Sequence, residues 1–171
     1  IPFDGSSIVG YATIEESDKI AVPNPQSFVI LPETIEKHRT ARLICDIYEP
    51  DGSRSVVDTK YVLERVIEKA KNHGFNFNTG PECEFFLFKK DGERTTLTPN
   101  DSAGYFDLSH RDLAEGVRAD ISLALEKVGI QLHTSHHEVS DGQHEINFKY
   151  DDAITTAENV ITLKYITKII A

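Results

Sequence analysis

The sequence predicts an α+β protein, and this expectation rests on three observations. Residues 1–57 are rich in β-branched residues and in segments that alternate between apolar and polar side chains. Near Asp58 the hydrophobic period changes to that of a helix. Further on, Asp141–Gly142 separates two strand-like segments and has the composition of a tight hairpin turn. The change of period also suggests two domains, residues 1–57 and residues 58–171.

The first domain is expected to hold three strands, and the second is expected to begin with a helix. The strands are residues 7–14, 27–31 and 41–52, of which the last ends in a turn. The helix starts after Asp58, a residue type that caps helix N-termini, and ends before Gly74. Its apolar residues fall at helical spacing and are Leu63, Val66, Ile67 and Ala70.

Three further strands are expected in the second domain. Residues 80–89, GPECEFFLFK, form a short run of apolar and aromatic residues that is typical of a strand. Residues 130–139 and 143–150 alternate on either side of the Asp141–Gly142 turn. These two segments therefore predict an antiparallel hairpin.

Two more helices follow from capping signals. Ser109 and Asp112 have the spacing of a helix cap and its third position, and the helix that they begin is expected to end at Gly129. Thr155 and Glu158 form a second capping box. We expect the last helix to start there and to continue to the end of the chain.

Composition limits the class of protein and its partners. The 171 residues carry a net charge of −10, which disfavours a nucleic-acid partner because such proteins present a basic face. No apolar run is long enough to span a membrane. The only cysteines, Cys45 and Cys83, are far apart, which favours the reducing cytoplasm. The absence of methionine indicates a piece of a longer polypeptide.

Four glutamates are the candidate functional residues. Glu82 and Glu84 are expected on one face of a segment apolar enough to be buried, because side chains alternate along a strand. With a two-residue turn at 141–142, Glu138 pairs with Glu145 on one face of the hairpin. Like charges so placed repel, and burial disfavours their ionised forms. Each pair therefore requires a bound cation or a protonated acid.

Two interpretations of these acids stand side by side. In the first, they supply the oxygen ligands that Mg²⁺ or Mn²⁺ prefers. In the second, Glu82 and Glu84 are ordinary solvated residues at the rim of a sheet. The hairpin histidines lack the HExxH spacing of a zinc site, and alternation places only His136, and not His137, on the face of Glu138. Most of these histidines are expected to be hydrogen-bonded structural residues.

Four blocks of sequence, in order, resemble one enzyme family. They are FDGSSIVGYATIEESD, GPECEFFLF, AGYFD and HHEVSDGQHEINFKY, and they cover the chain from Phe3 to its last helix. Together they are similar to glutamine synthetase of the prokaryotic type I class. The resemblance implies an incomplete β-grasp-like N-terminal domain, followed by the first part of a catalytic domain that has an antiparallel sheet and flanking helices.

The resemblance also implies an activity and its cofactors. Enzymes of this family use ATP to convert glutamate to γ-glutamyl phosphate, which ammonia then attacks to give glutamine. By motif position, Glu84, Glu138 and Glu145 match the ligands of one Mg²⁺ or Mn²⁺ ion, and Glu82 matches a ligand of a second. The implied partners are glutamate, ammonium, ATP and identical subunits in a double-ring dodecamer, with no nucleic acid and no membrane.

Three other residues receive roles from the resemblance. Asp4 matches a loop residue that helps to bind and deprotonate ammonium in a neighbouring subunit, and Tyr105 matches a residue near the same pocket. Judged by the residues alone, Asp4 is an ordinary turn residue. His133 stands where family members carry a glutamate that contacts the nucleotide, so it is a candidate nucleotide-binding residue with altered chemistry.

Two other functions stay open at this point. One is a γ-glutamyl–amine ligase of the same fold, although Asp4 favours ammonium as the amine. The other is a non-catalytic structural or regulatory relative, which the four glutamates disfavour and His133 mildly favours. Further family ligands of metal, phosphate and glutamate are expected beyond Ala171, so the chain is expected to be inactive alone.

Overall fold

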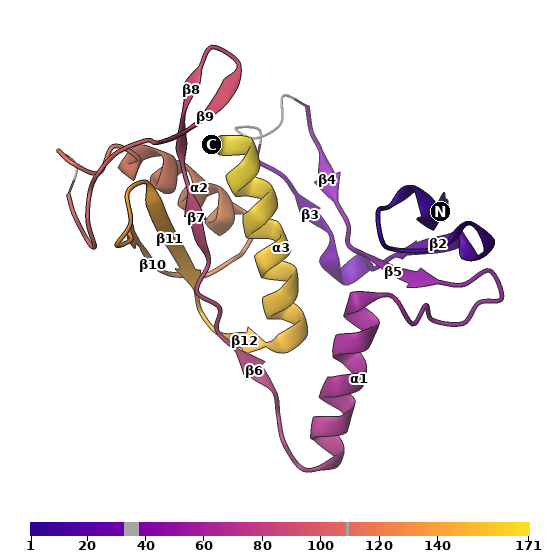
Figure 1. The fold of residues 1–171 in the computed structure, drawn as a ribbon. Helices are drawn as coiled ribbons and strands as arrows, with labels where there is room; N and C mark the ends of the chain where they lie inside the picture. Colours follow the sequence, from indigo (N-terminus) through magenta and orange to yellow (C-terminus); the bar gives the residue numbers. More distant parts are fainter. Residues whose placement is uncertain (33–37, 109) are drawn as a thin grey trace. The chain divides into compact units, whose positions relative to one another are not determined.

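The computed structural model describes residues 1–32, 38–108 and 110–171 (Figure 1). These residues form two compact units. Unit 1 holds residues 1–30, 40–78 and 152–154, and unit 2 holds the described part of 31–39 together with 79–151 and 155–171. The domain boundary suggested between residues 57 and 58 stays a prediction. The α+β class is confirmed, since both units combine antiparallel strands with helices.

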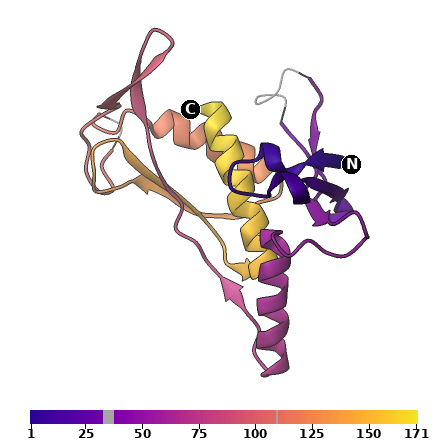
Figure 2. The same cartoon turned by 45° about the vertical axis from the view of Figure 1, so that its right-hand side comes forward.

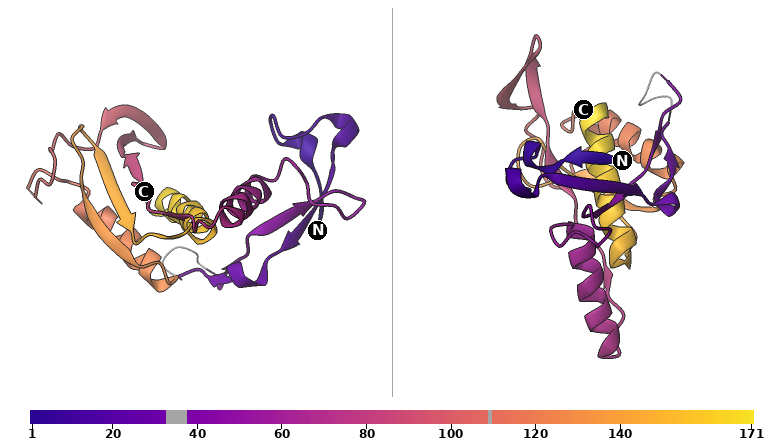
Figure 3. Two further views of the ribbon diagram at one scale, coloured as in Figure 1. Left: turned by 90° about the horizontal axis from the view of Figure 1, so that it is seen from below. Right: turned by 90° about the vertical axis from the view of Figure 1, so that its right-hand side faces the viewer.

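Unit 1 is built on a three-stranded antiparallel sheet in the order β1-β2-β5, whose indigo and purple strands lie together in Figure 3. A separate pair joins β3 to β4. The bounds are β1 (Pro2–Asp4), β2 (Asp18–Pro23), β3 (Val29–Ile30), β4 (Ala41–Arg42) and β5 (Cys45–Tyr48). The strand expected at residues 27–31 is present in shortened form as β3, whereas the single strand expected at residues 41–52 is divided into β4 and β5, which belong to different sheets.

The strand expected at residues 7–14 is wrong. The Asp4 carboxylate accepts a hydrogen bond from the Ser6 backbone N–H at 2.8 Å, and the chain turns there into a short 3₁₀ helix, Gly5–Ser7. A second such helix, Ile14–Glu16, precedes β2. Local side-chain capture of the backbone therefore overrides the β-branched composition, and the strand forms at residues 18–23 instead.

The first expected helix is confirmed as α1 (Thr59–Asn72). Asp58 caps it, because its carboxylate accepts a hydrogen bond from the Lys60 N–H at 3.0 Å, and Gly74 ends it with a φ of 81°. None of the 14 residues of α1, all of which the structure describes, is buried. Of its apolar residues, Val62 and Val66 are exposed, whereas Leu63, Ile67 and Ala70 are half-buried.

Unit 2 contains a three-stranded antiparallel sheet in the order β10-β11-β7. Helices α2 and α3 pack against it, as Figure 2 shows, through a core centred on Ile121, Ile146 and Ile166. A hairpin of β8 and β9 extends from the chain after β7, and β6 pairs with β12. The bounds are β6 (Asn78–Thr79), β7 (Glu84–Phe86), β8 (Phe88–Asp91), β9 (Arg94–Pro99), α2 (Glu115–Lys127), β10 (Leu132–His137), β11 (Gln143–Phe148), β12 (Asp151–Asp152) and α3 (Ala153–Ile170).

Both remaining helices are present, but their starts differ from the expected ones. Helix α2 begins at Glu115, whereas Ser109 lies outside the described residues. Asp112 does not act as a third-position residue, because its carboxylate pairs with Arg118 and accepts a hydrogen bond from the Ala114 N–H. Helix α3 begins two residues before Thr155, so the second capping box is also wrong. Among the described residues, no helix combines the length and apolar character needed to cross a membrane.

Candidate metal centre

The β10–β11 hairpin differs in register from the expected one. His136 pairs with Glu145, whereas the two-residue turn had placed Glu138 there. The turn is wider, and it is closed by hydrogen bonds from the Gln143 N–H to Ser140 O (3.0 Å) and from the Glu138 N–H to Gln143 O (2.7 Å). Because side chains alternate with a period of two, a two-residue shift keeps Glu138 and Glu145 on one face.

That face of the sheet carries mostly polar side chains, with Phe86 of β7 as an apolar exception, whereas the opposite face supplies the core. Phe85 of β7 and Cys83, which precedes β7, pack against the core, to which Ile146 and Phe148 of β11 belong. The alternation expected in GPECEFFLF is therefore confirmed. The side chains of this face are those of Glu84, Phe86, Thr134, His136, Glu138, Gln143, Glu145 and Asn147, and we call it the polar face because Phe86 is its one apolar member among them.

Three of these side chains converge. His136, Glu138 and Glu145 each offer one ligand atom, and the three atoms lie within 4.8 Å of one another. His136 Nδ1 is 3.1 Å from the His137 carbonyl oxygen, to which it donates. That bond leaves His136 Nε2 facing Glu145 Oε2 at 3.4 Å. An imidazole held by a backbone carbonyl, with its other nitrogen free, is the usual arrangement of a metal-binding histidine.

Electrostatics at this group favour a cation. Burial raises the pKa of Glu145, and the neighbouring Glu138 carboxyl acts in the same direction, against the lowering effects of Asn147 and His136. The Asn147 amide donates to Glu145 Oε1 at 2.5 Å and so fixes the carboxylate. A divalent ion would remove the repulsion between the two acids, and two carboxylates with one imidazole fit Mn²⁺ or Mg²⁺.

Glu84 lies next to this group but does not join it in the chain alone. It stands opposite Glu145 in the β11–β7 pairing, and its Oε2 accepts a hydrogen bond from the Gln143 amide at 2.6 Å. Glu82 precedes β7. Both side chains are exposed, as the second of the two interpretations has it, and not buried as the first requires. Their assignment as metal ligands stays a prediction.

The aromatic residues before α2 border the group. Phe106 stacks on His136 with ring centroids 4.3 Å apart, and Tyr105 meets the same imidazole edge-on at 5.4 Å. Phe106 adopts a φ of 55° and donates its N–H to His137 O at 3.1 Å. The structure thus brings Tyr105 beside His136, while its role near an ammonium pocket stays a prediction.

Asp4 and His133 have local roles in the structure that differ from those the resemblance implies. Asp4, in unit 1, caps the 3₁₀ helix, and hydrogen bonds from the Ser6 hydroxyl and N–H lower the pKa of its carboxyl group. His133 is exposed and falls where the pairing register shifts between Leu132 and Thr134. The ammonium and nucleotide roles of these residues stay predictions.

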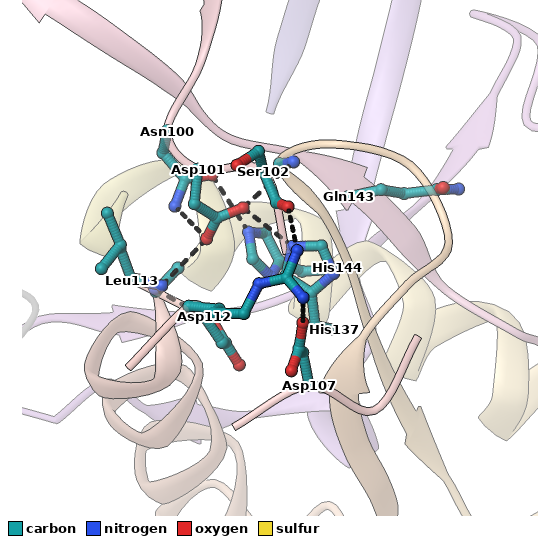
Figure 4. A network of polar contacts seen from close by, with 12 residues as sticks. Asn100, Asp101, Ser102, Asp107, Asp112, Leu113, His137, Gln143 and His144 are labelled. Atoms are coloured by element: carbon teal, nitrogen blue, oxygen red, sulfur yellow. Dashed lines mark hydrogen bonds and ion pairs between the residues drawn. The ribbon is translucent and has the colours of Figure 1, made fainter. Parts of the chain in front are cut away.

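A buried polar network lies on the other face of the hairpin (Figure 4). His137 Nε2 donates to Asp101 Oδ1 at 2.9 Å, and its Nδ1 donates to Glu138 O at 2.6 Å. The expectation that the hairpin histidines are mostly hydrogen-bonded structural residues is therefore confirmed for His137.

His144 is held differently in the same network. Its Nδ1 accepts from Arg118 at 3.0 Å, and its Nε2 donates to Asn100 Oδ1 at 3.3 Å. The ring is thus neutral, and burial, assisted by the charges of Arg118 and His137, lowers the pKa of His144 to about 4. Asp101, His137 and His144 also lie close enough to suggest a metal group, but protons and Arg118 already occupy their ligand atoms.

Sequence reasoning left two residues of this region without a role. His136 was placed on the face of Glu138 but was not counted among the metal ligands, although its position in the alternating strand was a sufficient signal. Asp101 was not singled out at all. It stands in the segment Pro99–Ser102, whose Asn-Asp-Ser composition indicates only a turn.

Comparisons with known proteins agree on one family. The model of the glutamine synthetase beta-Grasp domain matches residues 1–50, and that of the glutamine synthetase catalytic domain matches residues 56–171. The glutamine synthetase of Clostridium saccharobutylicum is 52% identical over 170 residues, which are 99% of this chain and 38% of that protein. That of Thermus thermophilus is 51% identical over 177 residues, covering 100% of this chain and 40% of that protein.

Solved structures give the same result. Plasmodium falciparum glutamine synthetase matches with a TM-score of 0.86 and 27% identity, covering 99% of this chain and 39% of that one. A GmaS/ADP complex matches with a TM-score of 0.84 and 26% identity over the same shares. The chain therefore spans about two fifths of the length of the relatives that it matches.

Proposed function

The chain belongs to the glutamine synthetase family, and we propose that it serves the ATP-dependent ligation of ammonia to glutamate through γ-glutamyl phosphate. The observation that carries this proposal is the convergence of His136, Glu138 and Glu145 on the polar face of the catalytic-domain sheet. A phosphoryl-transfer enzyme needs such a group, because its catalysis rests on positioning and on charge neutralisation.

We assign Glu84, Glu138 and Glu145 to one divalent ion, Mg²⁺ or Mn²⁺, with the His136 imidazole beside them as a further candidate ligand of that ion, and Glu82 to a second. Bound ions of this kind neutralise phosphoryl oxygens and the charge that develops during transfer. The residues of the chain set the geometry of these ligands. Asn147 fixes the Glu145 carboxylate, and Gln143 draws Glu84 toward the same face.

The remaining assignments follow the family. Asp4 binds and deprotonates ammonium in the site of a neighbouring identical subunit, and Tyr105 lines the same pocket beside His136. His133 contacts the nucleotide ATP. Assembly into a double-ring homo-oligomer and a cytoplasmic location belong to the same proposal, since Asp4 can serve a neighbour only within an assembly.

The test is a chimera in which this chain replaces the matching segment of Clostridium saccharobutylicum glutamine synthetase. With ATP, glutamate, ammonium and Mg²⁺ we expect glutamine and ADP to form, and we expect Glu138→Gln to abolish both. A chimera that assembles but forms no glutamine would overturn the proposal. Activity with a primary amine in place of ammonium would favour the γ-glutamyl–amine ligase, whereas the identity of about 50% to named glutamine synthetases supports ammonium.

A further inference from the structure

We propose that Asp101 is a positioning residue, which holds Glu138 of the candidate metal centre in place through His137. The inference rests on the proposed function, because it assigns Glu138 to a metal ion. It concerns a buried carboxylate on the opposite side of the hairpin from the metal ligands, in the segment between β9 and α2.

Asp101 is a hub of hydrogen bonds with its side chain only 1% exposed. Its Oδ1 accepts from His137 Nε2 at 2.9 Å and from the Gly142 N–H at 3.2 Å. Its Oδ2 accepts from the Leu113 N–H at 2.9 Å and from the Asn100 amide at 3.0 Å. Two donors at each oxygen use the full accepting capacity of an ionised carboxylate. Figure 4 shows this convergence.

The imidazole of His137 connects Asp101 to the candidate metal centre. His137 passes from Asp101 on one side to the Glu138 carbonyl on the other, at 2.6 Å. That carbonyl belongs to the residue at which β10 has ended and the turn begins. The ring adds a third restraint at Glu138, beside the bond from its N–H to Gln143 O and the bond from the Val139 N–H to its carboxylate. Losing the ring would leave the Glu138 carbonyl without this donor and would loosen the turn that places the carboxylate beside Glu145.

The negative charge of the Asp101 carboxylate is needed for these hydrogen bonds. Burial alone would raise the pKa of the Asp101 carboxyl group, but hydrogen bonds from His137 and the Leu113 N–H lower it. The lowered pKa keeps the Asp101 carboxylate ionised, so that both of its oxygens accept hydrogen bonds. An asparagine at this position has one oxygen in place of two, and its NH₂ group would face donors. The amide therefore cannot satisfy the four hydrogen bonds that the carboxylate accepts.

The experiment measures Mn²⁺ binding to the 171-residue chain by the loss of the free-ion EPR signal, together with thermal unfolding by circular dichroism. The variants are Asp101→Asn, His137→Gln and the double variant. His137→Gln keeps a donor near Asp101 and loses the one to Glu138 O. The matched control is Asp58→Asn, another buried carboxylate that binds backbone N–H groups and an arginine, but in unit 1.

We expect Asp101→Asn and His137→Gln each to weaken Mn²⁺ binding by about 10-fold, the usual cost of losing an outer partner of a metal ligand. Adding Asp101→Asn to His137→Gln should cost less than about twofold more, because the path is already cut. Asp58→Asn should lower the melting temperature and leave Mn²⁺ binding unchanged. If Asp101→Asn does not fold, His137→Gln tests the same path with the carboxylate intact.

Two results would overturn the inference. One is a variant at Asp101 or His137 that melts lower but binds Mn²⁺ as the wild type does. The other is a pair of losses that simply add in the double variant, which would show independent effects. Absence of Mn²⁺ binding by the wild type, with no change on Glu138→Gln, would instead overturn the metal assignment, and this inference with it.

Discussion

At the residue scale, Glu138 and Glu145 are two acids whose proximity costs free energy until a cation arrives. Glu138→Gln removes one charge but keeps an oxygen that can accept from the Val139 N–H, as Glu138 Oε2 does at 2.9 Å. We therefore expect the metal-free variant to melt at or above the wild-type temperature. The upward shift that Mg²⁺ or Mn²⁺ gives the wild type should be lost.

Thermal melts with and without metal check this prediction, with Glu126→Gln as the control. Glu126 is an exposed acid on α2, so both its melting temperature and its metal-induced shift should match the wild type. A Glu138→Gln protein that melts lower without metal and keeps its metal-induced shift would contradict the assignment.

His144 gives the stability of unit 2 a pH dependence. Its pKa is about 4 in the folded protein and 6.5 in the unfolded chain, so below pH 6.5 the unfolded state binds a proton that the folded state does not. Stability is therefore complete above pH 6.5 and is lost as the pH falls toward 4. The loss amounts to at most about 3 kcal/mol.

Urea unfolding at a series of pH values measures this loss. His144→Asn is the comparison, because an amide oxygen can still accept from Arg118 but does not titrate. The difference in unfolding free energy between the two proteins should shrink steadily from pH 7 to pH 4. Parallel curves for the two proteins would show that His144 is not the group responsible.

The sequence predicts the positions of Glu138 and Glu145 but not the role of Asp101, because only the first depends on neighbours in the same strand. Glu138 and Glu145 could be placed on one face from alternation alone, and that placement survived an error of two residues in register. Asp101 could not be found, because its importance depends on partners distant in sequence, His137 and Gly142. In the sequence, Asp101 has the same local composition around it as an ordinary turn residue, so only the folded structure shows that it is buried and bonded to four donors.

At the scale of the element, the hairpin turn depends on one glycine. Gly142 has a φ of 65°, and a Cβ there would lie 2.8 Å from the Leu87 carbonyl oxygen. Gly142→Ala is therefore expected to destabilise the chain by roughly 2 kcal/mol or more, through backbone strain and this clash. Gly116→Ala, in α2, meets open space and should stabilise by about 0.5–1 kcal/mol.

Chemical denaturation of both variants beside the wild type decides the point. A Gly142→Ala protein as stable as Gly116→Ala would mean that the turn can relax away from Leu87. In that case the wide turn would also be a weak constraint on Glu138, whose N–H closes it.

The elements themselves show when sequence signals suffice. Helix α1 was found with its cap because Asp58 and Gly74 bound an uninterrupted pattern. The start of α2 was missed because the Asp112 carboxylate, with the right spacing for a capping box, is engaged by Arg118. Likewise, no strand was expected at β2, which begins with the charged residues Asp18 and Lys19, whereas in the fold Lys19 is buried against Glu49. Tertiary partners decided both cases.

At the scale of the whole molecule, exposed apolar side chains predict association. Phe86 and Phe88 stack on the surface at 6.3 Å, and Leu97 of the β8–β9 hairpin is 92% exposed. The 171-residue chain is therefore expected to self-associate. Because it spans about two fifths of the length of its relatives and catalysis of this kind requires two positioned substrates, we expect it to form no glutamine alone.

Sedimentation velocity at several concentrations and a glutamine assay of each fraction check this expectation. Leu97→Lys should reduce the association without creating activity. A monomeric fraction that forms glutamine above background, in proportion to its protein content, would show that this chain suffices for catalysis.

The register shift in β10 has a consequence for how this hairpin can vary. Leu132 pairs with Phe148 of the core, whereas Thr134, two positions later, pairs with Asn147 of the polar face. His133 is the extra residue at this register shift. It lets Leu132 point toward the core while the side chains of Thr134, His136 and Glu138 lie on the polar face. Deleting His133 would restore regular alternation along β10. Either Leu132 would then leave the core face, or Glu138 would leave the polar face. Because the register shift requires a residue at position 133 and not a particular side chain, substitutions there are compatible with the hairpin, whereas a deletion is not.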